Sequence, residues 1–222
     1  MAHSTKPLGV VVGLAAEARI ARSLGEVAIG GGCPDGAAAA AEALVARGVT
    51  ALLSFGVAGG LDPDLRPGDI AVPVAVLDGG QHYFTDATLC RVLGGATVSL
   101  LLAGDAVVAD AGAKRLLSAQ TGASAVDLES GAVARVARRH GLPFAVLRVV
   151  CDPAHRSLPS AAVAALSSAG AIRPLNVLGS IVARPWQIPA LLRLARDAAL
   201  ARRALVRAQQ DLPWHLYGAA SS

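Results

Sequence analysis

Short, almost wholly apolar runs recur along the chain and limit the folds that it can adopt. We expect strands at Leu8–Leu14, Val27–Ile29, Thr50–Phe55, Ile70–Val76, Ala96–Ala103 and Phe144–Val150. A strand that is apolar on both sides must be covered on both faces, as in a parallel sheet between helices. Helical patterns alternate with these runs, at Ala15–Leu24, Asp35–Arg47 and Asp110–Thr121 and from Asp127 onward. The alternation predicts a single α/β domain over residues 1–222, with a central, mostly parallel or mixed sheet flanked by helices.

The composition fits this fold and narrows the chemistry. Apolar residues make up 54% of the 222 residues, enough for a sizeable core of small aliphatic side chains. The three cysteines, Cys33, Cys90 and Cys151, are far apart, which fits a reducing compartment better than a disulfide scaffold or a zinc site. No histidine pair has metal-site spacing, so we expect no metal and no cofactor. No apolar stretch reaches about 18 residues, the length of a spanning helix. We expect a cytoplasmic protein that does not bind nucleic acid.

The C-terminal part of the chain differs in charge. Residues 173–207 contain seven arginines and one acid, Asp197. Ile188–Gln210 has a strong helical pattern with an apolar side, and we expect a basic helical extension over residues 173–210. The simpler interpretation is a terminal helix that docks on the sheet and exposes its arginines to water. The alternative is a peripheral membrane contact through residues 173–207, with Trp186 at the interface of an anionic lipid surface.

Two carboxylates flank one predicted helix–strand unit. Glu129 lies at the start of the helix, and Asp152 comes just after the strand Phe144–Val150. Ligands of open parallel sheets bind outside the carboxyl ends of the strands, which is where Asp152 is expected. Paired carboxylates suit acid–base work on a bond that breaks through a cationic transition state, and cleavage of a glycosidic bond is the natural candidate. The alternative is that each acid only caps its element.

Small residues form a second part of the predicted site. Gly31 and Gly32 lie between a short strand and a helix, where backbone N–H groups can approach a ligand. This turn lacks the Gly-Lys-Ser/Thr of a P-loop and the spacing of a dinucleotide motif. Ala58 and Gly59 belong to a glycine-rich turn that is expected after Phe55, where a ligand could also come close. A polar loop is expected at Asp78–Asp86.

Four short motifs resemble those of the nucleoside phosphorylase/nucleosidase superfamily, and they occur in the same order within residues 8–155. They are Gly59-Gly60-Leu61-Asp62-Pro63 with Gly68-Asp69-Ile70, Gly104-Asp105-Ala106, Val126-Asp127-Leu128-Glu129-Ser130, and Arg148-Val149-Val150-Cys151-Asp152. Each motif is weak alone, whereas the joint pattern is strong. The resemblance implies cleavage of the N-ribosyl bond of a purine nucleoside, as in methylthioadenosine/adenosylhomocysteine nucleosidases, by an enzyme that we expect to be a homo-oligomer.

The resemblance also implies roles for individual residues. Asp152 would protonate the purine ring as general acid, and Glu129 would hold the ribose hydroxyls with Leu128 packed on the sugar. Glu17 would orient the attacking water, unless Ala18 occupies that register instead. The other residues expected to bind substrate are Gly31 and Gly32 beside the ribose, Val107 and Val108 in the base-binding turn, and Ala58, Gly59 and Cys151.

Several positions depart from the family pattern. Val107 stands where family members stack an aromatic ring on adenine, and Cys151 replaces the usual serine before the acid. Val57 replaces a serine that helps to hold phosphate in phosphorylases, and no arginine follows Gly30–Gly32. We therefore favour water as the acceptor, with phosphate as a co-substrate in the alternative.

The segment Val74–Ala103 is shorter than in ordinary nucleosidases. Together with the arginine-rich tail, it makes the chain most similar to the hopanoid-associated phosphorylase-like proteins. This resemblance implies removal of adenine from adenosylhopane to give ribosylhopane, with specificity near His82–Phe84 and in the tail. The alternatives are an enzyme for soluble nucleosides such as methylthioadenosine, a purine nucleoside phosphorylase, a non-catalytic nucleoside-binding module, and a membrane-surface adaptor that acts through residues 173–207.

Overall fold

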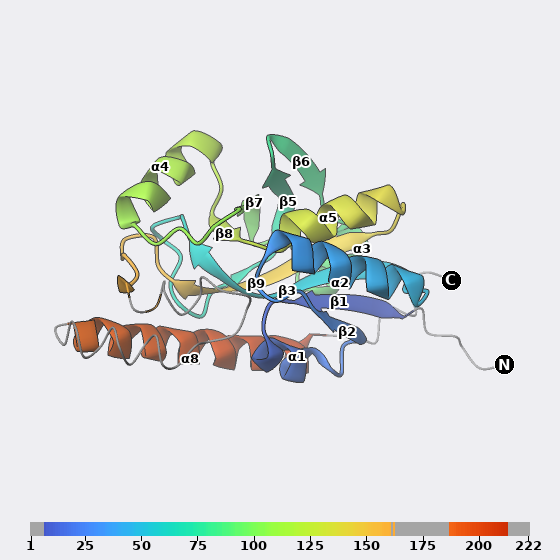
Figure 1. Cartoon of the computed structure of the whole chain (residues 1–222), viewed down its shortest axis with the longest axis horizontal. Helices are drawn as coiled ribbons and strands as arrows, with labels where there is room; N and C mark the ends of the chain where they lie inside the picture. Colours follow the sequence, from blue (N-terminus) through green and yellow to red (C-terminus); the bar gives the residue numbers. More distant parts are fainter. Residues whose placement is uncertain (1–6, 161, 163–186, 213–222) are drawn as a thin grey trace.

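The computed structural model describes residues 7–160, 162 and 187–212. Within these residues one sheet of nine strands lies between two layers of helices (Figure 1). The strands are β1 (Leu8–Val12), β2 (Glu26–Ile29), β3 (Ala51–Gly60), β4 (Ile70–Ala71), β5 (Pro73–Asp78), β6 (Gln81–Phe84), β7 (Val98–Ala103), β8 (Ala125–Asp127) and β9 (Phe144–Asp152). The helices are α1 (Ala15–Ala21), α2 (Pro34–Ala46), α3 (Ala87–Val92), α4 (Ala111–Thr121), α5 (Ser130–Arg139) and α8 (Ile188–Asp211). The expected single α/β domain with a mixed sheet is confirmed.

The long strand β3 joins the two halves of the sheet. β3 is parallel to β1 at Ala51–Ser54 on one side and to β9 from Leu52 to Gly59 on the other. At its C-terminal end Gly59 and Gly60 pair antiparallel with β8, which continues to β7, β5 and β6. The end of β3 therefore lies between the end of β9, which carries Asp152, and β8, which leads into Glu129. This pairing brings the two predicted acids to one edge of the sheet.

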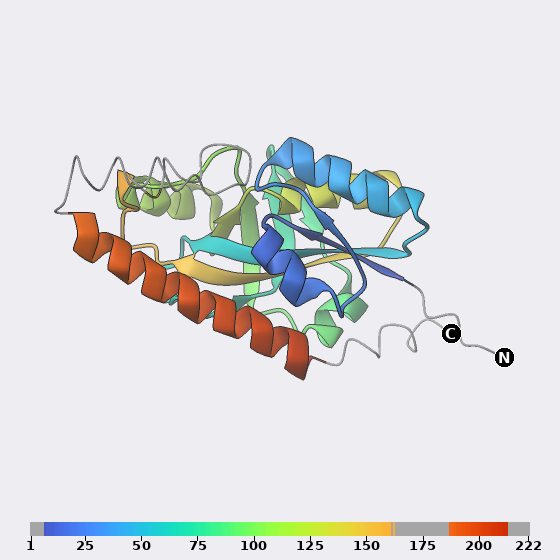
Figure 2. The ribbon, with the colours of Figure 1, turned by 60° about the horizontal axis from the view of Figure 1, so that its bottom comes forward.

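Alternate residues of the central strands enter two separate cores. Val10 and Val12 pack with the side that α1 and α8 cover, whereas Val11 packs with the side that α2 and α5 cover. Figures 1 and 2 show these helix pairs on opposite faces of the sheet. In β9, Leu147 and Val146 alternate in the same way. Because both faces of the sheet are covered, these strands do not alternate between apolar and polar residues. This explains the continuous apolar runs of the sequence.

Three boundaries differ from the sequence prediction, each because of a tertiary contact. The glycine-rich stretch after Phe55 is not a turn, because it continues β3 to Gly60. A Cβ atom on Gly56 would lie 2.6 Å from Nη1 of Arg148, so this part of the strand has no room for side chains. The run Ile70–Val76 is divided at Val72, since β4 pairs with β9 and β5 with β7.

The third difference concerns Asp78–Asp86, which is a hairpin rather than a loop. Gly79 and Gly80 have φ angles of 55° and 81° and form the tight turn between β5 and β6. The structure also adds two elements that the sequence analysis did not predict, β8 and the short helix α3. By contrast, α4 ends as expected, with Gly122 in the left-handed conformation at φ 70°.

Helix α8 agrees with the predicted terminal helix. Its buried side, which includes Ala201, Ala204 and Leu205, packs against the face formed by β9 and α1, while Arg193 and Arg203 are exposed. Residues 173–186 of the predicted extension, Trp186 among them, lie outside the described residues. In the described part of the chain, no helix has both the length and the apolar character needed to cross a membrane.

Candidate active site

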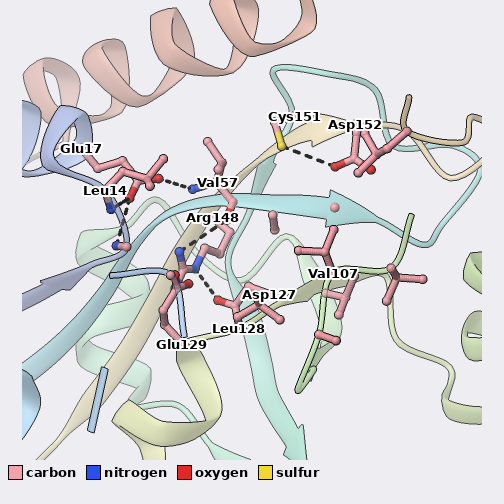
Figure 3. A pocket seen from close by; sticks show the side chains of 18 of the residues that line it. Leu14, Glu17, Val57, Val107, Asp127, Leu128, Glu129, Arg148, Cys151 and Asp152 are labelled. Atoms are coloured by element: carbon pink, nitrogen blue, oxygen red, sulfur yellow. Dashed lines mark hydrogen bonds and ion pairs between the residues drawn. The ribbon is translucent and has the colours of Figure 1, made fainter. Parts of the chain in front are cut away.

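A pocket lies at the carboxyl ends of β1, β3 and β9, beside the segment that follows β8 (Figure 3). Ten of the eleven residues that the sequence analysis assigned to the site line it, and Gly31 is the exception. They are Glu17, Gly32, Ala58, Gly59, Val107, Val108, Leu128, Glu129, Cys151 and Asp152. Further lining residues include Leu158, after β9, and Leu194, on α8. The fold thus brings the ten predicted residues together from six separate stretches of the chain.

Glu17 points from the first turn of α1 into the pocket. Its Oε2 accepts hydrogen bonds from the backbone N–H groups of Gly13 and Leu14, at 3.0 and 2.9 Å. Its Oε1 accepts a 3.0 Å hydrogen bond from the N–H of Val57 on β3. Ala18 instead packs in the hydrophobic core. Of the two registers left open by the sequence, Glu17 is therefore the one that presents a carboxylate to the pocket.

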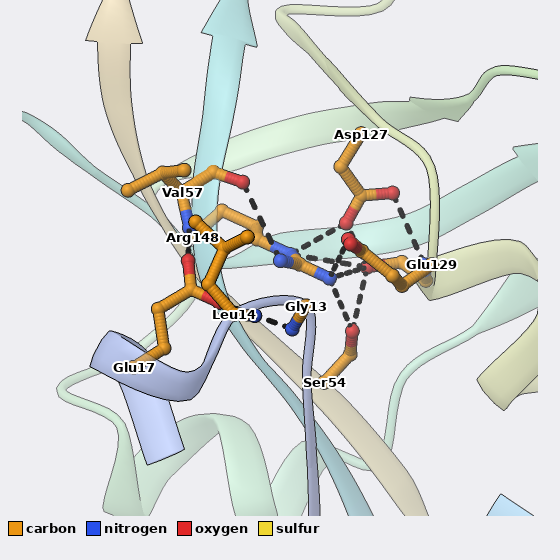
Figure 4. A network of polar contacts seen from close by, with 9 residues as sticks. Gly13, Leu14, Glu17, Ser54, Val57, Asp127, Glu129 and Arg148 are labelled. Atoms are coloured by element: carbon orange, nitrogen blue, oxygen red, sulfur yellow. Dashed lines mark hydrogen bonds and ion pairs between the residues drawn. The ribbon is translucent and has the colours of Figure 1, made fainter. Parts of the chain in front are cut away.

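Beneath the pocket, Arg148 of β9 holds a buried polar cluster together (Figure 4). Its Nε lies 2.5 Å from Oδ2 of Asp127, and its Nη2 lies 2.9 Å from Oε2 of Glu129. Nη2 also donates a 2.6 Å hydrogen bond to Oγ of Ser54. A buried guanidinium is tolerated only when its charge and its donors are matched in this way.

The cluster also positions Glu129. Asp127 accepts hydrogen bonds from the backbone N–H of Ser130, at 3.1 Å, and from its hydroxyl. These bonds fix the start of α5, so that Glu129, just before the helix, turns toward Arg148 and the pocket. Sequence reasoning gave Asp127 and Arg148 no role beyond the motifs in which they occur. A buried arginine in an otherwise apolar strand was the available signal.

Burial makes two of the carboxylates weak acids. Desolvation is the largest effect on the pKa of Glu129 and raises it to about 7. The attraction of Arg148 lowers this pKa, but the repulsion from Asp127 and Glu17 offsets part of that attraction. Desolvation also raises the pKa of Glu17, against the opposing effects of Arg148 and the three backbone N–H groups. A carboxyl group with a pKa near neutrality can exchange protons at physiological pH, which is what acid–base catalysis requires.

Asp152 ends β9 at the other side of the pocket. Gly59 lies so close to it that a Cβ atom there would be 3.3 Å from Oδ1. Oδ1 accepts a 3.4 Å hydrogen bond from the thiol of Cys151, and burial raises the pKa of that thiol well above its usual range. Oδ2 forms an ion pair with Nζ of Lys114, which reaches it from α4.

Lys114 is the main residue that the sequence analysis missed. Its side chain is 0% exposed, and its Nζ also donates hydrogen bonds of 3.1 Å to the carbonyl oxygens of Pro153 and Arg156. The sequence held one signal for it, a lysine on a helix in a chain whose other cations are almost all arginine.

The expected specificity segment lies elsewhere. His82 and Phe84 belong to the β5–β6 hairpin and border a separate groove with Arg138, not the pocket of the three acids. No residue of 74–103 is among the described residues that line the pocket. The structure therefore does not bring His82–Phe84 to the pocket of its own chain, and a role of this segment in specificity stays a prediction. The groove beside the hairpin includes Phe144 at the amino end of β9, whereas the pocket lies at the carboxyl end of that strand.

The arrangement of the acids suits cleavage of a bond between two parts of a ligand. Figure 3 shows Glu17 and Asp152 toward opposite ends of the pocket, with Glu129 and Leu128 on its wall. A group held between them could receive a proton from one end while water approaches from the other. The buried negative charge would stabilise a cationic transition state between them.

Comparisons with known proteins agree with the fold. The sequence matches the Phosphorylase superfamily over residues 20–99 and 97–183. A methylthioadenosine/adenosylhomocysteine nucleosidase of Neisseria meningitidis, in complex with methylthio-immucillin-A, is 18% identical with a TM-score of 0.65, over 92% of this chain and 97% of that one. A D-to-N variant of the Helicobacter pylori nucleosidase with 5′-methylthioadenosine in its active site is 19% identical, with a TM-score of 0.65, over 93% and 99%.

A futalosine hydrolase of Helicobacter pylori is 18% identical with a TM-score of 0.65, over 95% of this chain and 99% of that one. A comparison with curated protein sequences finds no significant match. The matched segments cover most of the chain, and these solved structures share its fold. The chain belongs to the Phosphorylase superfamily.

Proposed function

We propose that this protein is a nucleosidase that hydrolyses the N-ribosyl bond of an adenine nucleoside. Asp152 protonates the leaving base, Glu129 binds the ribose hydroxyls, and Glu17 orients the attacking water. The observation that carries the proposal is that these three acids, from three separate elements, line one pocket with Glu17 and Asp152 toward its opposite ends. Structural relatives that hold methylthioadenosine or an analogue of it support a nucleoside as the ligand.

The charges of the site support this chemistry. Breaking the bond to the base leaves positive charge on the ribose, and the purine departs more readily once its ring is protonated. Glu17 and Glu129 supply negative charge on the ribose side, and burial raises the pKa of each, which favours uptake of a proton by its carboxylate. Hydrolysis needs both properties, since the attacking water must lose a proton.

The same charges favour water over phosphate as the acceptor. Among the described residues that line the pocket, Arg148 is the one basic side chain. Its guanidinium is already engaged by Asp127, Glu129 and Ser54, so it offers a phosphate ion no free donor fork. Carboxylates beside it would repel a dianion. Phosphorolysis remains the alternative that the family membership allows.

We extend the proposal to a nucleoside with an apolar 5′ group, adenosylhopane, which would give ribosylhopane and adenine in hopanoid biosynthesis. Leu158 and Leu194 add apolar surface to the pocket, and Leu194 brings α8 to it. Leu192, on the same helix, is 66% exposed, and Arg193 and Arg196 are exposed beside it. Such a helix could rest on an anionic membrane while a lipid tail leaves the pocket along it.

This extension carries further expectations. A lipid-linked substrate implies a cytoplasmic enzyme that contacts the inner face of the membrane peripherally through residues 173–207. By resemblance to the family, we also expect a homo-oligomer. Neither expectation is needed for the nucleosidase activity itself.

An adenine-release assay tests the proposal. Purified protein is incubated with adenosylhopane, methylthioadenosine and inosine, each with and without phosphate. We expect adenine from adenosylhopane without phosphate, and a slower reaction of the soluble nucleosides. Leu194→Glu should slow adenosylhopane cleavage more than methylthioadenosine cleavage. The matched change Leu116→Glu, at an exposed position on α4 outside the pocket lining, should not alter that ratio.

Other outcomes would favour the alternatives. Equal rates with methylthioadenosine would favour a nucleosidase for soluble substrates, and a strict phosphate requirement would favour a phosphorylase. Adenine binding without turnover would favour a non-catalytic binding module, in which Asp152→Asn alters affinity alone. Sedimentation with liposomes, with and without residues 173–207, tests the adaptor interpretation separately.

A further inference from the structure

The Lys114–Asp152 ion pair raises a chemical question about the proposed general acid. Asp152 lines the pocket, but its Oδ2 is bound to a buried ammonium. A carboxylate in such a pair carries no proton that it could give to a leaving base. The proton must therefore come from a neighbour. Lys114 holds one at Oδ2, whereas the Cys151 thiol at Oδ1 has a raised pKa, which opposes release of its proton.

Among the described residues, Lys114 has one partner that can accept that proton, Asp152. Its three N–H donors meet three acceptors, Oδ2 of Asp152 and the carbonyl oxygens of Pro153 and Arg156. A peptide carbonyl oxygen is a very weak base, whereas a carboxylate can accept a proton. Because Lys114 is 0% exposed and does not line the pocket, it can act on the ligand only through Asp152.

The choice of lysine is informative in this chain. Of its 20 lysines and arginines, two are lysines, Lys6 and Lys114. The next residue on α4, Arg115, is exposed. The buried cation beside Asp127, Glu129 and Glu17 is an arginine, Arg148, and arginine keeps its proton in proteins. A lysine ammonium can release its proton when it is desolvated beside an acceptor.

We propose that Lys114 is the positioning residue and proton source for Asp152. One proton moves from Nζ to the carboxylate of Asp152, and the carboxyl group passes it to a ring nitrogen of the base as the C1′–N bond breaks and its electron pair goes to the base. Water adds its oxygen to C1′ and gives a proton to Glu17. After the products leave, Glu17 returns this proton to solvent, and Lys114 takes one up.

This inference rests on the proposed nucleosidase activity, and the test uses two substrates. The first is an adenine nucleoside that the wild-type protein cleaves, and the second is p-nitrophenyl riboside, whose leaving group departs without protonation. The variants are Lys114→Met, Lys114→Arg, and Arg115→Met as the matched control on the same helix. Lys114→Arg keeps the charge and the donors but not the transferable proton, and it decides the outcome if Lys114→Met does not fold.

We expect both Lys114 variants to lower kcat for adenine release by about 100-fold with KM changed by less than about threefold. Hydrolysis of p-nitrophenyl riboside should stay within about threefold of wild type, and Arg115→Met should leave both reactions unchanged. A role limited to holding the fold would slow both substrates equally, and that result would overturn the inference, as would adenine release at the wild-type rate. Either result leaves the proposed function standing. If the wild-type protein released no adenine, the proposed function and this inference would fail together.

Discussion

Nη2 of Arg148 lies 2.9 Å from Oε2 of Glu129, and both side chains are buried beneath the pocket. The same guanidinium contacts Asp127 and attracts the carboxylate of Glu17. One cation therefore balances three acids in a place that water barely reaches. This balance determines both the stability of the cluster and the protonation of the site.

Removal of Arg148 should destabilise the protein strongly. Arg148→Met leaves buried carboxylates without a counter-charge, and we expect a loss of about 3 to 5 kcal/mol in the free energy of unfolding. Urea denaturation measures this loss. The control is Arg139→Met, which breaks an exposed ion pair with Glu42 and should cost about 0 to 1 kcal/mol. Equal losses in the two variants would contradict the structural role assigned to Arg148.

The raised pKa of Glu129 predicts a specific pH dependence of stability. Its pKa in the folded protein, about 7, is above its ordinary value of 4.5, so the folded state keeps a proton that the unfolded chain has already lost. The stability that this group contributes is complete below about pH 4.5 and is lost as the pH rises through about 7.

Denaturation curves over a pH series test this dependence. The free energy of unfolding of the wild type, relative to Glu129→Gln, should fall by roughly 3 kcal/mol between about pH 4.5 and pH 8. Glu17 shifts in the same direction and is present in both proteins, so the difference reports Glu129 together with its interaction with Glu17. Parallel pH profiles for the two proteins would refute the raised pKa.

Glu17 should matter for turnover more than for binding. Glu17→Gln keeps the size of the side chain but removes the charge that would accept a proton from water, so we expect kcat to fall by about 100-fold with little change in KM. Steady-state adenine release measures both constants. The matched control is Glu26→Gln, which should behave as wild type. Glu26 is an exposed acid on β2 that forms an ion pair with Arg47. A Glu17 variant that only weakens binding would argue against the water-orienting role.

Val107 provides a test of where the base binds. It lines the pocket at the position where relatives are expected to stack an aromatic ring on adenine. Val107→Phe should therefore tighten adenine binding by about 1 kcal/mol, measured by titration calorimetry. Leu116→Phe, at an exposed position on α4, should have no effect. Unchanged or weaker binding by the Val107 variant would place the base elsewhere in the pocket.

The sequence alone determined the fold class and most of the acids of the site. Apolar runs and helical periodicity are local properties, so β9, α4 and α8 were predicted close to their observed bounds. Motifs such as Val126–Ser130 and Arg148–Asp152 carry several residues of the site within a few positions, which is why Glu129 and Asp152 could be named without a structure.

Only the tertiary structure decided which side chains meet. Whether residues 56–60 are a turn or a strand depends on the space that Arg148 leaves. Whether Glu17 or Ala18 faces the pocket depends on the packing of α1 against β3, where the N–H of Val57 binds Glu17. Lys114 and Asp152 are 38 residues apart, and burial of either charge is favourable only beside the other. Such a pair has no periodicity to detect, because it forms only when α4 is packed against the end of β9.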